Sequence, residues 1–507
     1  MNRALAGTCP ILTCDEARTL EAALFAGDEA REWAAMRQAG QAIAAAVLRD
    51  SGEIGGLPAA ARLLVLVGKG HNGGDALIAA DALLRALPLA RAEVVFAFGE
   101  RPLRPLAAQA WREFAQRAGD RVRGSAGVPP AFCYDLCLDG VFGFQFRPPA
   151  DARITDLLEH VNAMPIRLRA AVDLPSAGLF QADFTYATGS VKAPVVGDPK
   201  AGRVRYLDLG FFPYRTPGDS RVLTARLLAP LAGLRPPHSD KRTFGHVFIL
   251  GGSRSFPGAV LMTVLAALRS GAGLVTAFVP ESVVGAFAAR APEAMWVGWP
   301  ETPSGGLALE GEHLWRERME RASALVVGPG LGRDPETLAL VASLVRSSTV
   351  PVVIDADALQ PETVSAGSAP RILTPHAGEF ARISGGLDGP AFAAKTGATV
   401  VLKGPVTRLV SVPPAGTAAG SANAPIYHSF FGGPVLARGG SGDLLAGLVG
   451  GLLAQTPGDP LLAAARGVVW HGTAADLLAR AHGQTSVSVV QLLDFLSAAL
   501  KESAHDP

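Results

Sequence analysis

This chain of 507 residues has no excess of positive or of negative charge. Lys and Arg total 46 and Asp and Glu total 45, which leaves a formal net charge of +1. No basic stripe or acidic tail stands out along the sequence. Bulk electrostatics therefore gives the chain no means of recruiting nucleic acid or an anionic membrane, and we expect neither partner.

Cysteine is scarce, and apolar runs of spanning length are absent. Cys9, Cys14, Cys133 and Cys137 lack the two-residue spacing of a zinc or redox motif, so we interpret them as buried free thiols. Gly, Pro or charge interrupts every apolar run, and no charged and then apolar leader opens the chain. These absences predict a cytoplasmic location.

Apolar residues and turn formers are abundant. Hydrophobic residues make up 49%, with 58 glycines and 38 prolines. Large cores joined by tight turns have this composition, which is typical of an α/β enzyme. The length predicts a pair of domains or more.

Strand-like and helix-like runs alternate on both sides of a proline-rich seam near Leu228–Thr243. Before the seam we predict a helix over Asp15–Asp50 and strands at Leu63–Val67, Glu93–Phe98 and Ala170–Asp173. After the seam we predict strands at Val247–Leu250, Leu274–Val279, Ala324–Val327, Val352–Ile354, Arg371–Leu373 and Thr399–Leu402, and helices that include Gly258–Ser270, Leu444–Leu453 and Leu461–Arg480. The halves show no convincing repeat, so they are two different α/β units.

The sharpest motif is GGSGD (439–443), which leads into an apolar helix. Glycine N–H groups and the positive helix end together favour an anion. Asp443 beside such a hole can accept a proton from a hydroxyl that attacks a phosphoryl group. The alternative is an aspartate that only caps the helix.

Other polar loops follow the ends of predicted strands: GPGLG (328–332), DADAL (355–359), LTPHAGE (373–379) and LKGPVT (402–407). Ligands of open α/β sheets bind beyond the carboxyl ends of the strands, so these loops should converge. Taken singly, His376 reads as a satisfied loop histidine, whereas for Lys403 a solvated lysine at a strand end is only the alternative. We assign Asp355 and Asp357 a capping role and no catalytic one.

The ordered set of these motifs, with GGS (251–253) and GAGLV (271–275), resembles the ADP/ATP-dependent NAD(P)H-hydrate dehydratases, a branch of the ribokinase-like fold. These enzymes repair nicotinamide cofactors hydrated at carbon 6 of the reduced ring, and use ADP or ATP to remove the water. The resemblance implies that Asp443 is the base. It implies a nucleotide and phosphoryl site at Lys403, Gly404, Pro405, Val406, Thr407, Gly440, Ser441 and Gly442. It implies a hydrate site at Ala259, Gly330 and His376. Mg²⁺ is expected because nucleotide phosphates need neutralisation. One departure is Arg438, in a GGPVLAR stretch (432–438) where the family has an NPGMA-like one; this cation could aid phosphate binding or alter nucleotide preference.

In the first half, GKGHNGGD (68–75) follows a predicted strand and precedes a helix. This satisfies G-x-G-x-x-G, and Glu100 near the end of the next strand would suit a ribose, so a Rossmann dehydrogenase is one alternative. The motif also resembles the NAD(P)H-hydrate epimerases, as do LDGVFG (138–143) and AVDLPS (171–176). That resemblance implies substrate contacts at His71, Asn72, Gly73, Gly74 and Asp75, a K⁺ ion held by Asn72, Asp139 and Ser176, and Asp173 as the proton-handling residue. Capping of strand ends is the alternative for Asp139 and Asp173.

This half departs from the epimerase pattern at several positions. Arg37 stands where the family has an acid, and Ala177 replaces a glycine. Phe144 and Phe146 lie in a turn that is Phe-Gly-Thr-Gly-like in the family, and no Asp-Thr-Gly loop follows. These changes should preserve the fold and weaken or abolish the epimerase.

We therefore expect a Rossmann-like three-layer epimerase-type domain at 1–222 and a ribokinase-like dehydratase domain at 223–507. The expected partners are NADHX or NADPHX and an adenine nucleotide, with the chain as a homo-oligomer. The rival hypothesis is a ribokinase-like small-molecule kinase whose first half is a non-catalytic scaffold.

Overall fold

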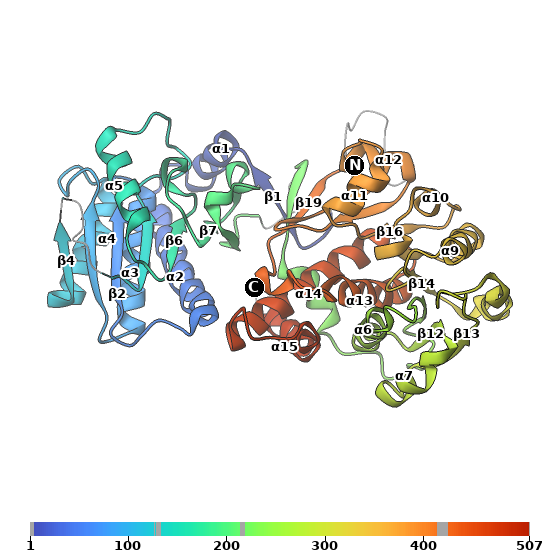
Figure 1. Ribbon diagram of the computed structural model, residues 1–507. Helices are drawn as coiled ribbons and strands as arrows, with labels where there is room; N and C mark the ends of the chain where they lie inside the picture. The colour runs from blue at the N-terminus through green and yellow to red at the C-terminus, as the bar shows by residue number, and fades with distance from the viewer. Residues whose placement is uncertain (1–4, 126, 128–132, 213–217, 413–423, 506–507) are drawn as a thin grey trace. The chain divides into compact units, whose positions relative to one another are not determined.

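The computed structural model describes residues 5–125, 127, 133–212, 218–412 and 424–505. They form two compact units. The N-terminal unit comprises Cys9–Gly218, within the limits just given, together with Ala479–Gln484 from far along the chain. The other described residues form the C-terminal unit (Figure 1).

The N-terminal unit is built on a seven-stranded parallel sheet in the order β4-β3-β2-β5-β6-β7-β9. The strands are β2 (Arg62–Val67), β3 (Arg91–Phe96), β4 (Val122–Ser125), β5 (Leu136–Gly140), β6 (Arg169–Val172), β7 (Phe184–Thr188) and β9 (Arg203–Leu207). A short parallel pair joins β1 (Thr8–Leu12) to β8 (Val191–Lys192). Val67 aligns with both Phe96 and Gly140, so the loops after three strands meet at one edge.

Alternation along β2 explains the three layers. Leu63, Val65 and Val67 pack into a core with α2 (Glu29–Asp50), α3 (His71–Ala86) and α4 (Pro105–Ala118). Leu64 and Leu66 point to the opposite face and pack against α5 (Ala152–Ala163). The predicted three-layer α/β class of this half is confirmed.

The single helix predicted over 15–50 is wrong, because the chain breaks it. The structure has α1 (Cys14–Phe25) and then α2. Ala26 and Gly27 adopt left-handed φ values of 49° and 77°, and Asp28 caps α2 by accepting from two backbone N–H groups. Apolar residues recur at helical spacing on both sides of Ala26-Gly27-Asp28, and this continuity concealed the end of α1 and the start of α2.

The C-terminal unit contains strands in the order β13-β12-β11-β14-β15-β16-β17-β18-β19-β10. They are β10 (Ser220–Leu223), β11 (His246–Leu250), β12 (Leu274–Pro280), β13 (Met295–Trp299), β14 (Ala324–Val327), β15 (Val352–Ile354), β16 (Arg371–Leu373), β17 (Thr399–Leu402), β18 (Thr407–Val410) and β19 (Ile426–Ser429). Neighbouring strands pair in parallel, except that β18 runs antiparallel to β17 and β19. Six of these strands were predicted within a residue at each end.

Helices cover this sheet too (Figure 1). They are α6 (Pro257–Arg269), α7 (Val284–Arg290), α8 (Glu312–Arg316), α9 (Pro335–Ser347), α10 (Pro361–Val364), α11 (Ala377–Ser384), α12 (Gly389–Thr396), α13 (Ser441–Gln455), α14 (Pro460–His482), whose last turn belongs to the N-terminal unit, and α15 (Leu492–His505). Helix α13 lies so close to the sheet that a Cβ on Gly450 would stand 2.2 Å from Val326. Phe248 and Leu250 of β11 pack on the other face with Trp299 and Trp315.

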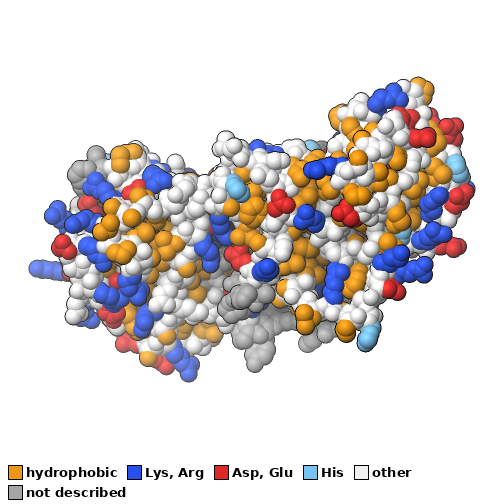
Figure 2. All heavy atoms as spheres, turned by 90° about the horizontal axis from the view of Figure 1, so that it is seen from below, with side chains coloured by type: hydrophobic (Ala, Val, Ile, Leu, Met, Phe, Trp, Pro, Cys, Tyr) orange, Lys and Arg blue, Asp and Glu red, His pale blue; other side chains and the backbone are white. Residues whose placement is uncertain are grey.

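The charged side chains on the described surface reflect the balanced numbers of acidic and basic residues in the sequence. Figure 2 shows basic and acidic side chains interspersed over the face in view. Among the described residues, no helix is long and apolar enough to cross a membrane.

Candidate active sites

The start of α13 forms the predicted anion hole. Gly440 is its N-cap with φ 95°, and a Cβ there would lie 2.7 Å from Met262 Sδ, so glycine is required. The Ser441 N–H donates to Arg438 O at 3.3 Å, and no described side chain caps the helix, which leaves the N–H groups of Gly442 and Asp443 for a ligand. The Ser441 hydroxyl donates to Leu436 O at 2.7 Å, so this side chain shapes the loop.

Asp443 lies in the first turn of α13 and is half-buried. Burial and, second to it, nearby Asp355 raise its pKa to about 7 against the lowering effect of Lys403. A carboxylate that titrates near neutral pH is suited to taking a proton from a hydroxyl. Capping, the alternative role, is not what Asp443 does, because Gly440 is the N-cap.

Lys403 is held against the anion hole. Its Nζ lies 3.0 Å from Asp355 Oδ1 and 3.8 Å from Glu379 Oε2. Burial works to lower the pKa of Lys403, but these two carboxylates outweigh it and raise the pKa. A Cβ on Gly442 would stand 3.2 Å from the same Nζ, which places the lysine beside the glycine loop. The solvated-lysine interpretation is therefore wrong.

Asp355 is the residue that sequence reasoning missed at this site. It is 1% exposed and accepts from Thr374 Oγ1 at 2.7 Å as well as from Lys403. It orients the lysine, which a strand-end capping role would not do. Asp357 does hold a loop, because it accepts from Gly332 N at 3.0 Å.

The predicted hydrate residues divide into two places. Gly330, with φ 69°, packs against Ala259 of α6, where a Cβ would come within 3.0 Å of the Ala259 Cβ. His376 caps α11 through Nδ1, yet its side chain remains 62% exposed. The Lys403 N–H donates to Pro375 O at 2.9 Å, so the His376 loop and the Lys403 loop lie side by side. Gly404, Pro405 and Val406 form the turn from β17 to β18, and Thr407 begins β18.

Arg438 does not project toward the glycine loop as a lone cation. Its guanidinium donates to Val487 O at 2.9 Å and to Thr485 O at 2.6 Å, which holds the segment after α14. The departure at this position therefore has a structural explanation.

The N-terminal unit holds a pocket of about 430 Å³ at the edge where β2, β5 and β6 end. Of the predicted residues, His71, Asn72, Asp75 and Asp173 line it. Gly73 and Gly74 instead allow close packing, since a Cβ would stand 2.4 Å from Gly68 O and 2.5 Å from Met36 Sδ respectively. Six phenylalanines also line the pocket: Phe25, Phe98, Phe142, Phe144, Phe146 and Phe211.

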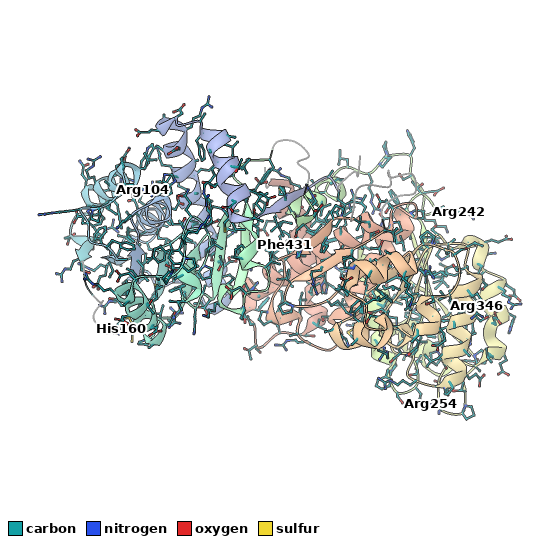
Figure 3. All side chains as sticks on the ribbon, turned by 90° about the horizontal axis from the view of Figure 1, so that it is seen from above. Arg104, His160, Arg242, Arg254, Arg346 and Phe431 are labelled. Atoms are coloured by element: carbon teal, nitrogen blue, oxygen red, sulfur yellow. The ribbon has the colours of Figure 1, made fainter. Side chains whose placement is uncertain are left out.

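Two features of this pocket suit a ligand with a flat ring and negative charge. Phe142 stacks on Phe146 with ring centroids 4.1 Å apart. Lys69 and Arg104 are exposed lining residues, joined through the Arg104 N–H to Lys69 O at 2.8 Å (Arg104 is labelled in Figure 3). Aromatic side chains thus replace the family's glycine-containing turn without filling the cavity.

Asn72, Asp139 and Ser176 come together beside the pocket. Ser176 Oγ donates to Asp139 Oδ1 at 2.6 Å, and Ser176 N donates to Asp139 Oδ2 at 2.8 Å. Asn72 Nδ2 donates to the backbone carbonyl of Phe142, and the backbone N–H of Phe142 donates to Ser176 Oγ. Burial raises the pKa of Asp139 to about 6, against the lowering effect of the Ser176 bonds. No group of three or more His, Cys, Asp or Glu suited to a metal occurs among the described residues.

Two of the departures, Arg37 and Ala177, do not line the pocket, although Ala177 directly follows Ser176. Arg37 is exposed and does not line the pocket. Ala177 occupies the turn with φ 56°, the left-handed conformation that glycine adopts without strain.

The fold and the two sites define a two-unit α/β enzyme, with a base beside an anion-binding helix start in one unit and a buried carboxylate pocket in the other. Residues 247–497 match the family model described as NAD(P)H-hydrate dehydratase, and residues 33–196 match the one described as YjeF-related protein N-terminus. The chain belongs to the bifunctional NAD(P)H-hydrate repair enzymes.

Relatives of that name extend over almost the whole chain. The one from Gloeobacter violaceus is 37% identical over 97% of this chain and 98% of its own length. The one from Moorella thermoacetica is 34% identical over 87% of each. Two solved structures each match a little over half of the chain: a ribokinase-like protein of Enterococcus faecalis (28% identity, 58% of this chain and 99% of that one, TM-score 0.48) and the ADP/ATP-dependent NAD(P)H-hydrate dehydratase of Bacillus subtilis (29%, 53% and 94%, TM-score 0.45). Family membership favours repair over the kinase and dehydrogenase alternatives.

Proposed function

We propose that residues 223–507 dehydrate the S form of C6-hydrated NADH or NADPH at the expense of ADP or ATP. The observation that supports this proposal best is the position of Asp443 in the first turn of α13, where its pKa is raised to about 7. Phosphorylation of the C6 hydroxyl converts a poor leaving group into a good one. The lone pair of the ring nitrogen then expels phosphate, and loss of a proton from C5 forms the C5–C6 double bond of NADH or NADPH.

Each part of the site has a task in this reaction. Asp443 takes the hydroxyl proton, while the backbone of Gly440, Ser441 and Gly442 and the charge of Lys403 stabilise the phosphoryl group in flight. The turn at 404–407 carries the adenine nucleotide. Ala259, Gly330 and His376 contact the hydrate. Mg²⁺ would enter on the nucleotide phosphates and supply charge neutralisation, with Asp443 and its acidic neighbours near enough to favour a cation.

Residues 1–222 interconvert the R and S hydrates, so that both feed the dehydratase. Asp173 handles the proton, and His71, Asn72 and Asp75 contact the substrate in the pocket. We assign a K⁺ ion to Asn72, Asp139 and Ser176 because the Ser176 hydroxyl and the Asp139 carboxylate are in direct contact and Asn72 reaches the same segment through the Phe142 carbonyl. K⁺ would supply charge that holds these loops together.

Two assays test these assignments. Purified S hydrate of NADH is given to the chain with ADP or ATP, and absorbance of the reduced nicotinamide ring is followed for wild type, Asp443→Asn and the control Asp494→Asn on α15. Nucleotide-dependent recovery that only Asp443→Asn abolishes supports the dehydratase, and no recovery by wild type rejects it. Added R hydrate then tests the first half, with K⁺ and with Na⁺ in its place. Sedimentation tests the predicted homo-oligomer.

A further inference from the structure

Asp173 is held in a strained conformation at the end of β6. Its φ is 67°, left-handed for a residue with a Cβ, which costs about 1–2 kcal/mol. The Asp173 N–H donates to Tyr186 O at 2.9 Å, and the next N–H turns back to Val172 O at 2.8 Å. Such strain persists where the surroundings impose it, and it clusters at functional sites.

Lys192 of β8 forms an ion pair with one oxygen of this carboxylate. Its Nζ lies 2.5 Å from Asp173 Oδ1 and 3.1 Å from Thr188 O, and 5.1 Å from the centre of the Phe144 ring. The side chain is 1% exposed. A fully buried ion pair adds little stability compared with apolar packing, so stability alone does not account for it.

The second oxygen of Asp173 is left for a ligand. Oδ2 is buried and has no hydrogen-bond partner among the described residues, although Asp173 and Lys192 both line the pocket. A buried carboxylate oxygen without a donor costs free energy unless a ligand supplies the donor. Of the two oxygens of Asp173, Oδ2 is therefore the one that can accept from a ligand in the pocket.

We propose that Lys192 is a positioning residue for epimerisation: by holding Oδ1, it makes Oδ2 of Asp173 the atom that takes the C6 hydroxyl proton of the hydrate. This inference rests on the epimerase function proposed above. It adds a residue that the epimerase resemblance did not supply.

The step balances. Oδ2 takes the hydroxyl proton, the O–H pair forms the C6 carbonyl, and the C6–N1 bond breaks with its electron pair moving to N1, where the ring carboxamide delocalises it. Rotation exposes the other face of the carbonyl. Ring closure reverses the electron flow, and Asp173 returns the proton to the oxygen.

The charged surroundings of Asp173 make Lys192 decisive. Burial raises the pKa of Asp173; Lys192 opposes this most strongly, and a backbone hydrogen bond from Thr188 also lowers the pKa. Asp75 from α3 and Glu21 and Cys14 from α1 also face this cluster, and burial raises their pKa values, that of Glu21 to about 7. Without Lys192, these neighbours and the low dielectric would leave Asp173 protonated and unable to accept.

The test follows R and S hydrate chromatographically on the full chain in K⁺ without nucleotide, so that dehydratase failure does not interfere. We expect Lys192→Met to lower kcat about 100-fold or more with KM within about threefold. The acidic limb of the pH profile should move to higher pH, and Lys192→Arg should recover part of the rate. Lys395→Met, an exposed lysine on α12, is the matched control.

A double-mutant cycle and a second readout separate the outcomes. Lys192→Met should cost nothing more in an Asp173→Asn background, because it acts through that carboxylate. Carboxyl ¹³C NMR should show the pKa of Asp173 rising in Lys192→Met, which needs no activity and also reports a folded variant. An active wild type with an unchanged kcat and pH profile in Lys192→Met overturns the inference alone. A wild type that never interconverts the hydrates overturns the epimerase function, and the inference with it.

Discussion

The site residues act through the charges of their neighbours. Asp443 and Asp173 are both carboxylates, but Asp443 shares its surroundings with Asp355, Asp357 and Lys403, whereas Asp173 has a lysine directly on one oxygen. The same chemical group is therefore tuned differently in the two units.

Dehydration should depend on pH through Asp443. A base must be ionised to act, so kcat/KM should be constant above the pKa of about 7 and fall about tenfold per pH unit below it. Lys403→Met removes a charge that lowers this pKa, so the limb should move to higher pH at saturating nucleotide. A profile that stays flat down to pH 5 would exclude Asp443 as the base.

Ala177→Gly should stabilise the N-terminal unit. Relief of the left-handed strain at φ 56° stabilises the folded state by about 1–2 kcal/mol. The greater conformational entropy of glycine in the unfolded chain offsets about half of this. We expect a gain of about 0.5–1 kcal/mol in urea unfolding. Ala34→Gly, at an exposed position inside α2, is the control and should lose about 1 kcal/mol. A loss at both positions would show that Ala177 is unstrained.

At the scale of elements, glycines set how closely helices approach. Helix α13 contains Gly447 and Gly450, which poor helix propensity alone would disfavour. A Cβ on Gly447 would lie 2.1 Å from Thr263 O of α6. The anion hole is thereby held against α6, the helix that also carries Ala259.

Gly447→Ala should destabilise the C-terminal unit, although alanine is the better helix former. Overpacking costs about 1–3 kcal/mol, more than the roughly 1 kcal/mol gained in propensity. Thermal unfolding of the variant measures this balance. Gly458→Ala, where a Cβ would meet open space, is the matched control and should change little. A more stable Gly447→Ala would contradict the tight contact.

At the scale of the whole molecule, the chain returns to its first half near its end. Asp50 and Glu53 are each 1% exposed at the side chain; Arg480 lies 2.9 Å from Asp50, and Gln484 lies 2.6 Å from Glu53. A simple cut at residue 222 would remove both of these partners from the N-terminal unit.

Arg480→Met in the full chain should therefore cost about 3–5 kcal/mol, since it strips a partner from a buried carboxylate. Burial works to raise the pKa of Asp50, but Arg205 and Arg480 outweigh it and lower the pKa. The stabilising contribution is present above the unfolded-state pKa and disappears as pH falls through the folded one. We expect the difference in free energy of unfolding between wild type and variant to shrink as the pH is lowered from neutral to acid. Adding Asp50→Asn should recover part of the loss; if it does not, the pair is not the cause.

Much of the architecture was predictable from local pattern. The strands β14, β15, β16 and β17 are uninterrupted buried runs, and their bounds agree with those predicted. The strands β18 and β19 were missed because short antiparallel strands depend on their partners more than on their own composition. The break at Ala26 was missed because the helical periodicity on both sides outweighed the Gly27-Asp28 signal for the end of one helix and the start of the next.

The sequence by itself determined the α/β class, the family and the glycine loop with its aspartate, because ordered motifs at strand ends survive as local chemistry. Only the tertiary structure decided that Asp355 orients Lys403, that Arg438 holds a distant loop, and that Lys192 binds Asp173. Those pairs join residues 19 to 49 positions apart. Spacing along the chain does not encode such distances; the packing of strands and helices does.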